Sequence, residues 1–345
     1  MIDPIEKHLI SNELTLKRYR RFKRNRAAVI SVYVLLFMIL VSFTAELWFN
    51  SKPHVMKYHG EMYFPLVKDY HPSLFGRTDI QVMDYRSLEM GPNDWVVWPL
   101  VQWDAYESNS FVESYPAPPT KYNLMGTDDR GRDVFTRLVY GFRYTFVYAV
   151  GVWFLCYLIG CGIGAMMGYM GGKVDLIGMR AIEVFESLPA LLILLTIISI
   201  FKPSLFLLIV FSVLFYWTGI THYMRGQFLS LRKREYVEAA KAIGSTHKRI
   251  VFKHILPNAL TPILTLSPFE IASNISLLSV MDYLGLGLPA PTPSWGELLG
   301  QGQNYFTTAD WLVWYPTGAL VLTMGLLISI NLAVRDAFDA KSAVG

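Results

Sequence analysis

The side chains that could do chemistry gather first in the segment "GTDDRGRD" at residues 126–133. Three acids and two glycines lie within these eight residues, and such a group could hold a metal ion or a phosphate. However, Asp128, Asp129 and Asp133 lack the alternating spacing and the terminal glutamate of a calcium-binding loop. Turn formation and helix capping are therefore the better interpretation of this segment.

The same segment leads into an expected helix that runs through Arg137. Aspartate is favoured at helix N-termini because its carboxylate accepts hydrogen bonds from backbone N–H groups there. We therefore expect Asp128 or Asp129 to cap this helix. Arg130 and Arg132 are expected to form ion pairs at the surface.

Other candidate groups lack the neighbouring side chains that a reactive or ligand-binding site needs. The stretch "GYMGGKV" at 168–174 differs from a phosphate-binding loop because Val174 follows the lysine, where a serine or threonine is required. Three histidines have no cysteine or paired acid near them, and two more have no serine or cysteine nucleophile. In chain order these are His54, His59, His71, His222 and His247. We find no catalytic constellation, which argues against an intramembrane enzyme.

A basic segment, "REYVEAAKAIGSTHKRIVFKHILPN" at 234–258, separates two apolar stretches. Arg234–Ile243 contains good helix formers, and Ser245–Ile255 begins with a serine that can cap a second helix. Gly244 between them can take the left-handed conformation that ends a helix and turns the chain. Pro257 is expected to close the motif. The segment predicts two short helices joined at a glycine elbow.

Two interpretations of this elbow compete. A basic loop can simply bind anionic lipid headgroups. Against this, Ala239 and Ala240 beside Glu238 offer a surface that another protein can approach closely, and Ile250 lies about one helical turn before Ile255. We favour a docking element for another protein.

The elements around this elbow are membrane spans. The chain is 53% hydrophobic and only 17% charged, a balance that favours lipid over water as the solvent. Four uncharged runs approach or exceed the roughly 20 residues that cross a bilayer as helix: Ala27–Ala45, Phe146–Met170, Leu205–Met224 and Trp311–Val334. Two weaker runs are Ala181–Phe201, with acids only in its first turns, and Ile263–Met281, with one acid. The sequence predicts an all-α polytopic protein with six transmembrane helices.

The distribution of lysine and arginine predicts the orientation. The residues before 27 hold eight of them against three acids, 225–253 hold eight against two, and 284–310 hold none. By the positive-inside rule the first two segments and both termini are cytoplasmic. The first run is too long for a signal peptide, so it is expected to be an uncleaved span.

These assignments divide the chain into segments. The alternation of apolar residues over Trp95–Trp103 predicts strands in the external loop, whose aromatic residues could form a core, a membrane-interface belt or a peptide-binding surface. The expected segments are a cytoplasmic basic tail (1–26), a first transmembrane helix (27–49), an external loop or subdomain (50–138), a core of five further helices (139–334) with a cytoplasmic loop (225–261), and a cytoplasmic tail (335–345).

Two kinds of residue inside the spans indicate specific contacts: regularly spaced glycines and an acid. Gly160, Gly164 and Gly168 recur every fourth residue and predict a face on which another helix packs closely. Glu270 lies near the middle of a span, with Asn274 one helical turn away on the same face. Such an acid faces a translocation path, pairs with a neighbouring subunit, or lies close enough to the membrane interface to be hydrated, and the sequence leaves these alternatives open.

Four ordered stretches resemble one transporter family. "EAAKAIG" followed by "HILPNAL" resembles the EAA loop of ABC-importer permeases, and His254 is typical of the peptide and nickel branch. "MGTDDRGRDVFTRLVYGFR" at 125–143, "GYMGGKVDLIGMR" at 168–180 and "YLGLGLPAPTPSWGELL" at 283–299 are similar to the C-type subunit of dipeptide and oligopeptide permeases. The long external loop and Asp282 most resemble the microcin C and long-peptide subgroup.

The resemblance implies the fold of a type I ABC-importer permease in a bacterial inner membrane. It implies coupling to ATPases through Glu238, Ala239, Ala240, Gly244, His254 and Pro257. It also suggests an external rim for a substrate-binding protein at Gly126, Thr127, Asp128, Gly131, Arg132 and Asp133. The substrate path is expected to involve Glu270, Asn274 and Asp282, although Asp282 at the end of its span could simply be solvated.

The partners that the resemblance implies are a second homologous permease, two ATP-binding subunits, a substrate-binding protein and membrane lipid, without nucleic acid. ATP and magnesium would be bound by the ATPases, so no cofactor and no enzymatic activity are expected in this chain. A nickel permease is the alternative within the family. A secondary transporter or channel is the alternative outside it, and we see neither the internal repeats nor the broken spans that this class predicts.

Overall fold

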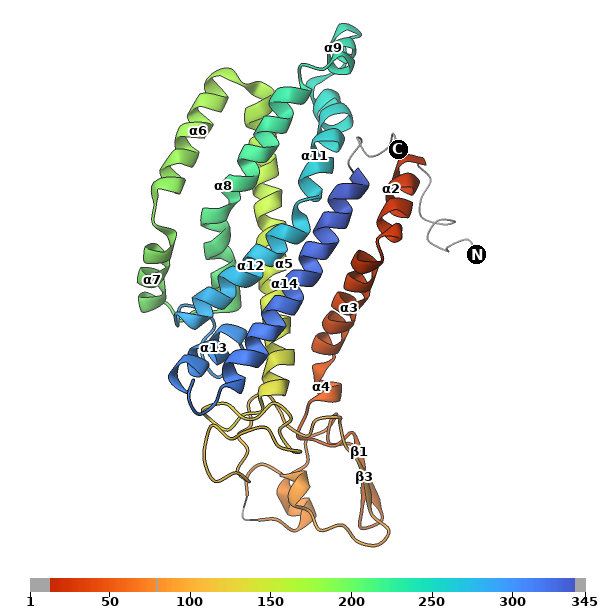
Figure 1. Cartoon of the computed structure of the whole chain (residues 1–345), viewed down its shortest axis with the longest axis vertical. Coiled ribbons are helices and arrows are strands. Elements are labelled where there is room, and N and C mark those ends of the chain that lie inside the picture. Colours follow the sequence, from red (N-terminus) through yellow and green to blue (C-terminus); the bar gives the residue numbers. More distant parts are fainter. Residues whose placement is uncertain (1–12, 79, 339–345) are drawn as a thin grey trace.

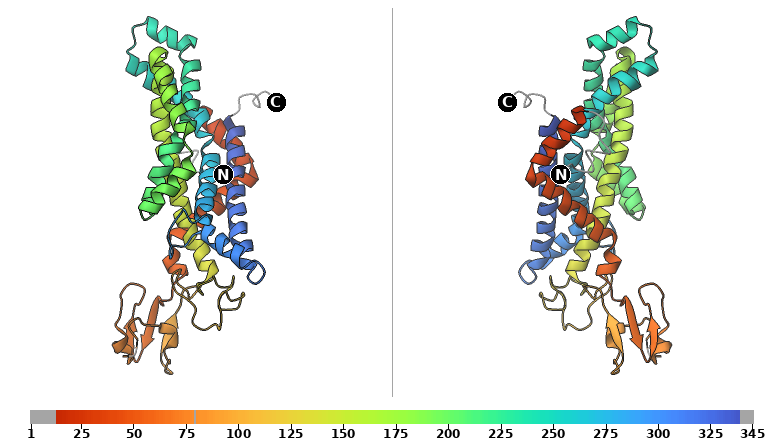
Figure 2. Two further views of the ribbon diagram at one scale, coloured as in Figure 1. Left: turned by 90° about the vertical axis from the view of Figure 1, so that its left-hand side faces the viewer. Right: turned by 90° about the vertical axis from the view of Figure 1, so that its right-hand side faces the viewer.

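The computed structural model describes residues 13–78 and 80–338. It shows a long helical bundle with a small subdomain at one end and a short helical projection at the other (Figures 1 and 2). The helices are α2 (Glu13–Arg24), α3 (Arg26–Phe43), α4 (Ala45–Trp48), α5 (Val134–Met170), α6 (Gly172–Ser187), α7 (Ala190–Ile200), α8 (Leu205–Leu231), α9 (Glu235–Ala242), α10 (His247–Arg249), α11 (Leu256–Leu264), α12 (Ser267–Tyr283), α13 (Trp295–Asn304) and α14 (Trp311–Phe338).

Four of these helices, α3, α5, α8 and α14, are long and apolar enough to cross a membrane. Two further pairs meet the same test together but are bent, by 63° between α6 and α7 and by 52° between α11 and α12. The described residues therefore contain four to six spans. The sequence analysis found spans but no broken spans at these two places, and the two bends correct this expectation. Pro189 precedes α7, and Pro262 and Pro268 flank the second bend, where each removes a backbone donor.

Helix α5 is much longer than the uncharged run that predicted it. It begins at Val134, inside the expected external loop, because Asp133 caps it. The Asp133 carboxylate accepts hydrogen bonds from the N–H and the hydroxyl of Thr136, both at 2.8 Å. The expected caps Asp128 and Asp129 do not have this role.

The glycine face of α5 packs against α8, as the sequence predicted. A Cβ atom added at Gly164 would lie 2.5 Å from the carbonyl oxygen of Thr221. Added at Gly168 or Gly160, it would lie 2.6 or 2.7 Å from a carbonyl oxygen of α8. Since real Cβ atoms do not approach other atoms this closely, only glycine permits this spacing of the two helices.

The subdomain at one end of the bundle, called the external subdomain after the predicted external loop, contains a three-stranded antiparallel sheet. Strand β1 (Val55–Tyr58) lies between β2 (Glu61–Tyr63) and β3 (Trp95–Val97), which is shorter than the predicted Trp95–Trp103. Two 3-10 turns, η1 (Pro72–Phe75) and η2 (Tyr85–Ser87), pack with the sheet. The Phe75 ring lies 5.0–6.4 Å from the rings of four tyrosines. These aromatic residues therefore form a core.

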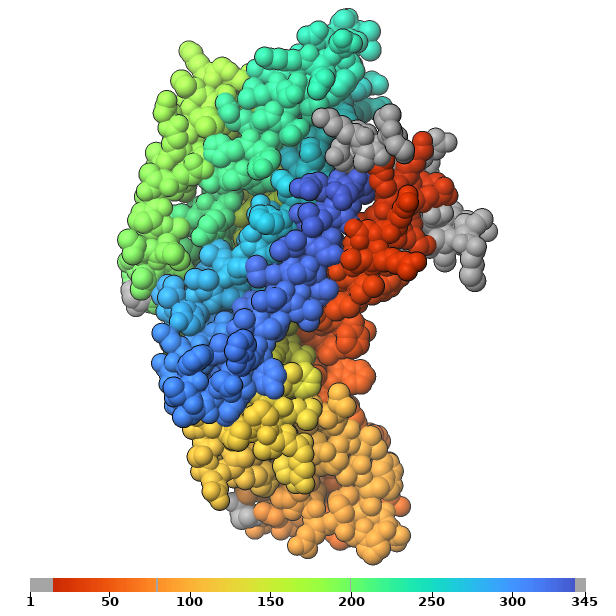
Figure 3. Space-filling view, in the orientation of Figure 1, coloured from red at the N-terminus to blue at the C-terminus, as the bar shows by residue number. Residues whose placement is uncertain are grey.

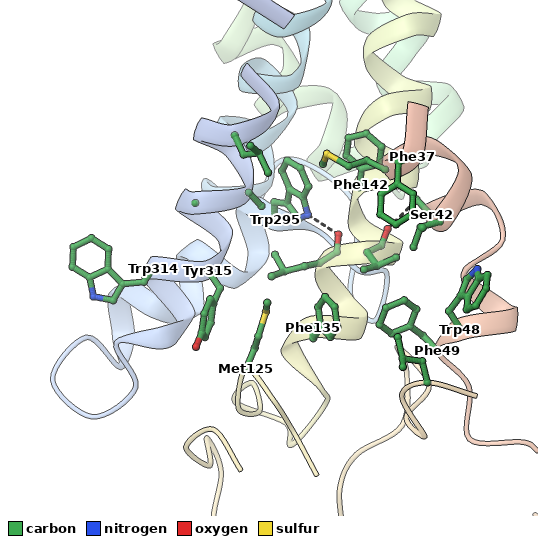
Figure 4. A pocket seen from close by; sticks show the side chains of 18 residues that line it. Phe37, Ser42, Trp48, Phe49, Met125, Phe135, Phe142, Trp295, Trp314 and Tyr315 are labelled. Carbon is green, nitrogen blue, oxygen red and sulfur yellow. Dashed lines mark hydrogen bonds between the residues drawn. The ribbon is translucent and has the colours of Figure 1, made fainter. Parts of the chain in front are cut away.

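An apolar groove of about 680 Å³ runs between α3, α5 and α14 (Figure 4). In its wall the indole N–H of Trp295 donates to the carbonyl of Leu138 at 2.8 Å. Phe37, Phe142 and Trp314 are among the lining residues, and none of the lining residues is charged. The groove offers nothing to orient a polar substrate, so we do not assign it to transport.

The contact between α5 and α8 predicts different outcomes for two neighbouring glycines. Gly164→Ala should lower the free energy of unfolding by about 1–3 kcal/mol, the usual cost of overpacking. Gly162→Ala should be neutral or slightly stabilising, because nothing lies within 4 Å of a Cβ added there and alanine favours helix. Thermal unfolding of both purified variants measures the difference. Equal midpoints would show that this contact does not constrain the fold.

Candidate functional site

The glycine elbow forms as the sequence predicted. Gly244 has a φ of +78° and follows Ile243, the C-cap residue of α9. Its N–H donates to the carbonyl of Lys241, and the N–H of Ser245 donates to that of Ala240, both at 3.0 Å. This pair of hydrogen bonds is a Schellman motif, which closes α9 and reverses the chain.

The second half of the elbow differs from the prediction. Thr246 rather than Ser245 caps the next helix, since its hydroxyl accepts the N–H of Arg249. The helix then continues through a π-helical turn, η3 (Ile250–Ile255), into α11. Pro257 lies in the first turn of α11 and does not end the motif. The wider π turn immediately before Pro257 is consistent with a residue that lacks an N–H.

One side of the elbow is fixed to the bundle. Val237 and Ala240 of α9 are buried, and they belong to one apolar cluster with Ile250 and Ile255 of η3 and with Phe228 of α8. Ala240 was predicted to face a partner, and its burial shows this to be wrong. The elbow is therefore packed against both the helix that enters it and the helix that leaves it.

The other side of the elbow faces outward. Glu238 and Ala239 are exposed, as expected, and Gly244 has open space around it. Ile243 is 83% exposed at the tip, and the sequence analysis did not single it out. An isoleucine directly before the elbow glycine, outside the apolar face of α9, is the signal that identifies it. In the space-filling view the elbow projects from the end of the bundle opposite the external subdomain (Figure 3).

His254 does not belong to the exposed side of the elbow. It is half-buried, and its backbone carbonyl accepts a hydrogen bond from the side-chain amide of Asn258 at 2.8 Å. His254 thus contributes to the helix that carries the elbow into α11.

At the opposite end of the molecule, the predicted external rim is buried. All six of its residues are inaccessible: Gly126, Thr127, Asp128, Gly131, Arg132 and Asp133. The Asp128 carboxylate accepts the backbone N–H groups of Arg130 and Arg132, both at 2.9 Å, and pairs with the Arg132 guanidinium at 2.7 Å. The segment is thus a structural core, and Arg132 pairs inside it rather than at the surface, where the sequence predicted it.

Two residues that the sequence analysis missed complete this buried ionic cluster. Arg137, fully buried near the start of α5, pairs with Glu297 of α13 and donates to the carbonyls of Ala105 and Pro291 at 3.0 and 3.1 Å. Arg132 also reaches Glu297, at 3.2 Å. An arginine at the start of an apolar helix needs an acidic partner. This need is the signal in the sequence that could have pointed to an acid such as Glu297.

The burial of this cluster affects its ionisation. Burial raises the pKa of Asp133. Burial also disfavours the charge of Arg132, but the hydrogen bonds and negative charges of Asp128 and Glu297 together outweigh this effect, and the pKa of Arg132 is raised. The cluster therefore holds Arg132 as a cation.

Among the three predicted path residues, only Glu270 has an uncommitted side chain. It lies in the first turn of α12, just after the bend, where the helix N-terminus favours a carboxylate. Among the described residues no ion pair or hydrogen bond reaches its carboxylate. Asn274 donates to the carbonyl of Ala149 on α5 at 3.2 Å.

Asp282 is neither solvated nor uncommitted. It is 7% exposed, and its carboxylate accepts the N–H of Leu288 at 2.7 Å and the hydroxyl of Ser294 at 2.5 Å. These bonds fix the turn between α12 and α13, which is a structural role.

Comparisons with known proteins agree with the resemblance of the four motifs. The family described as "Binding-protein-dependent transport system inner membrane component" matches residues 160–343, and "N-terminal TM domain of oligopeptide transport permease C" matches residues 17–66.

Three curated relatives extend over most of the chain. The inner membrane ABC transporter permease protein YejE of Escherichia coli K12 is 37% identical, covering 95% of this chain and 97% of its own length. The peptidoglycan transport system permease protein YejE of Agrobacterium fabrum is 35% identical, with coverages of 95% and 93%. The oligopeptide transport system permease protein OppC of Haemophilus influenzae is 30% identical, with coverages of 93% and 87%.

The buried ionic cluster predicts unequal effects of two similar substitutions. Glu297→Gln should lower the free energy of unfolding by about 3 kcal/mol, because it leaves the buried charge of Arg137 without its nearest partner. Glu46→Gln, which removes a half-exposed partner of Arg143, should cost less than about 1 kcal/mol. Thermal unfolding of both variants tests this. A loss for Glu297→Gln no larger than for Glu46→Gln would contradict the structural role of the cluster.

Proposed function

The chain belongs to the family of inner membrane components of binding-protein-dependent transport systems, and we propose that it is the C-type permease subunit of an ATP-driven peptide importer. The match to the N-terminal domain of oligopeptide permease C and the OppC relative support a peptide substrate. The name of the Agrobacterium relative supports a peptidoglycan fragment as the second candidate. The two bent pairs resemble the broken spans of a secondary transporter, but the matches to peptide permeases favour neither this alternative nor the nickel or channel alternatives.

We propose that the chain works in an assembly with a second, similar permease, two ATPases and a substrate-binding protein. The membrane-spanning chain offers no nucleotide-binding motif, so the free energy of ATP must enter through contact with another protein. The elbow is the element best built for such a contact, since one side is packed into the bundle and the other presents exposed Ile243. An exposed apolar side chain on a rigid support is typical of an interface anchor.

The path of the movement follows from the packing. A displacement at Ile243 is transmitted by Val237 and Ala240 to Ile250, and from there along the continuous helix that ends at Leu264. The bend of 52° then separates this lever from α12, which carries Glu270. We propose that nucleotide-driven motion of the elbow changes this bend and so opens the path to one side of the membrane. Shifting such a two-state assembly from one side to the other requires about 5.5 kcal/mol of differential binding.

The orientation that this function requires places the elbow in the cytoplasm. The excess of lysine and arginine around the elbow and before the first span supports this orientation. The end of α14 lies next to α2, where Arg18 stacks on the Phe338 ring at 4.3 Å. We therefore place α2 and the end of α14 on the cytoplasmic side, with the external subdomain outside.

Two substitutions in the elbow test the coupling. Ala239→Arg puts a bulky charge on the outward face, and Gly244→Val is strained at a positive φ by roughly 1–2 kcal/mol. Both variants should insert normally but lower substrate-stimulated ATP hydrolysis by the assembled transporter by roughly tenfold, as loss of an interface anchor would.

Gly172→Val is the matched control, because Gly172 also has a positive φ and open space but is the first residue of α6, outside the elbow. It should keep its stimulated hydrolysis. Full ATPase association and normal stimulation in both elbow variants would refute the coupling role.

Glu270 supports a narrower proposal, that it meets the cationic amino terminus of a peptide in the path. A half-buried acid without a partner among residues 13–78 and 80–338 needs water, another subunit or a cationic substrate to stay ionised.

Glu270→Gln should therefore lower uptake of a peptide with a free amino terminus by roughly tenfold, as loss of one charge-assisted contact would, and affect an N-acetylated peptide much less. Assembly and basal ATP hydrolysis should stay normal. Failure of the variant to assemble would indicate an ion pair with the second permease, and equal loss for both peptides would exclude amine recognition.

A further inference from the structure

A second pocket lies where the external subdomain joins the bundle. It has a volume of about 490 Å³ and is lined from four places: η2, the segment 100–111, the segment 121–124 and the start of α5. Trp103, Phe111 and Tyr122 supply aromatic surface, while Arg86 and Lys121 supply positive charge. A concave, mostly apolar site with a few polar groups is the usual form of a ligand-binding pocket.

Arg86 is a fixed part of the pocket wall. Its guanidinium stacks on the Trp103 ring at 4.2 Å and donates to Asp84 and to the carbonyl of Gln102, both at 2.9 Å. It also pairs with Glu107. Neither acid lines the pocket. The charge of Arg86 is thus already compensated, and its contacts hold the aromatic wall in place without a ligand.

Lys121 is the uncompensated cation of the pocket. No acidic side chain of residues 13–78 or 80–338 pairs with it, and its ammonium lies 4.8 Å from the centre of the Tyr122 ring. Asp133 is the acid in the lining, but its oxygens already accept hydrogen bonds from Asn123 and Thr136. One positive charge is therefore available to a ligand.

The rim of the pocket exposes apolar surface to water. Phe111 and Tyr122 are 67% and 66% exposed, and they stand beside the same opening as Lys121. Trp103 and Tyr122 each already have one cation over the ring, Arg86 and Lys121, which would repel a second cation. The pocket thus disfavours a cationic ligand, whereas an apolar group would gain by covering the rim.

We propose that this pocket binds a single carboxylate adjoining an apolar or aromatic group, with Lys121 contacting the carboxylate and Phe111 and Tyr122 covering the apolar part. The carboxyl end of an apolar peptide has this chemistry, and so does an acidic residue within an apolar segment of a protein partner. The site is distinct from the path at Glu270, and binding to it requires neither ATP nor transport.

The test uses the full chain in lipid nanodiscs without its partners. Calorimetric titration compares N-acetyl-Leu-Phe, which has a free carboxylate, with its amide. Because an exposed ion pair contributes modestly, the acid should bind about two- to fivefold more tightly than the amide. Lys121→Met should abolish this preference. The double variant Phe111→Ala with Tyr122→Ala should weaken both peptides by roughly tenfold.

Lys68→Met is the matched control, since Lys68 also lies over a tyrosine ring, at 5.4 Å from Tyr70, but outside the pocket. It should keep the preference for the acid. A third probe, N-acetyl-Leu-Asp-Phe amide, separates the two sources of the carboxylate. Binding as tight as that of the free acid assigns the site to a protein segment, and weaker binding assigns it to free peptide ends.

Equal binding of acid and amide to the unmodified chain, or an equal loss of preference in Lys68→Met, would overturn the proposal, as would the absence of binding. None of these results bears on the transport function, which is measured with ATPases and uptake.

Discussion

Helix α5 can approach α8 as closely as it does only because three glycines leave room for the α8 backbone, and this contact sets the frame for both ends of the molecule. The carbonyl oxygen of Thr221 would lie only 2.5 Å from a Cβ atom added at Gly164. At one end, α8 leads directly into the elbow, whose Val237 packs on Phe228 of α8. At the other end, Asp133 caps α5, and α5 carries Arg137 into the buried ionic cluster.

The two ends of the molecule are built for different tasks. The outer end is rigid, since Asp128, Arg132, Arg137 and Glu297 join the external loop, α5 and α13 through buried charge pairs. Breaking such pairs is costly, so this region resists local opening. The elbow end is held largely by apolar packing, with one hydrogen bond between Tyr169 of α5 and His247 at 2.7 Å. The helix that leaves the elbow is bent before α12. Such an element can tilt as a unit while the outer end stays fixed.

Sequence reasoning succeeded where the cause is local. Uncharged runs predict spans because burying charge in lipid is costly, and Gly244 predicts a turn because a positive φ favours glycine. It failed where the cause is a distant neighbour. The inward position of Ala240 depends on Ile250 and Phe228, and the burial of Arg132 depends on Glu297, which is 165 residues away in the chain. Thr246 and Ser245 are adjacent hydroxyl residues, so the cap could not be chosen between them without the backbone.

The central claim is that the elbow is the point where an ATPase contacts this chain. Cross-linking from Ile243→Cys tests it most directly, in a background without Cys156 and Cys161 and with exposed Thr307→Cys near the opposite end as the control. In the assembled transporter, a short thiol cross-linker should join position 243 to an ATPase subunit, and assembly should protect this cysteine from a soluble thiol reagent. The cysteine at 307 should show neither effect. Unchanged labelling at position 243, with no ATPase captured, would contradict the account.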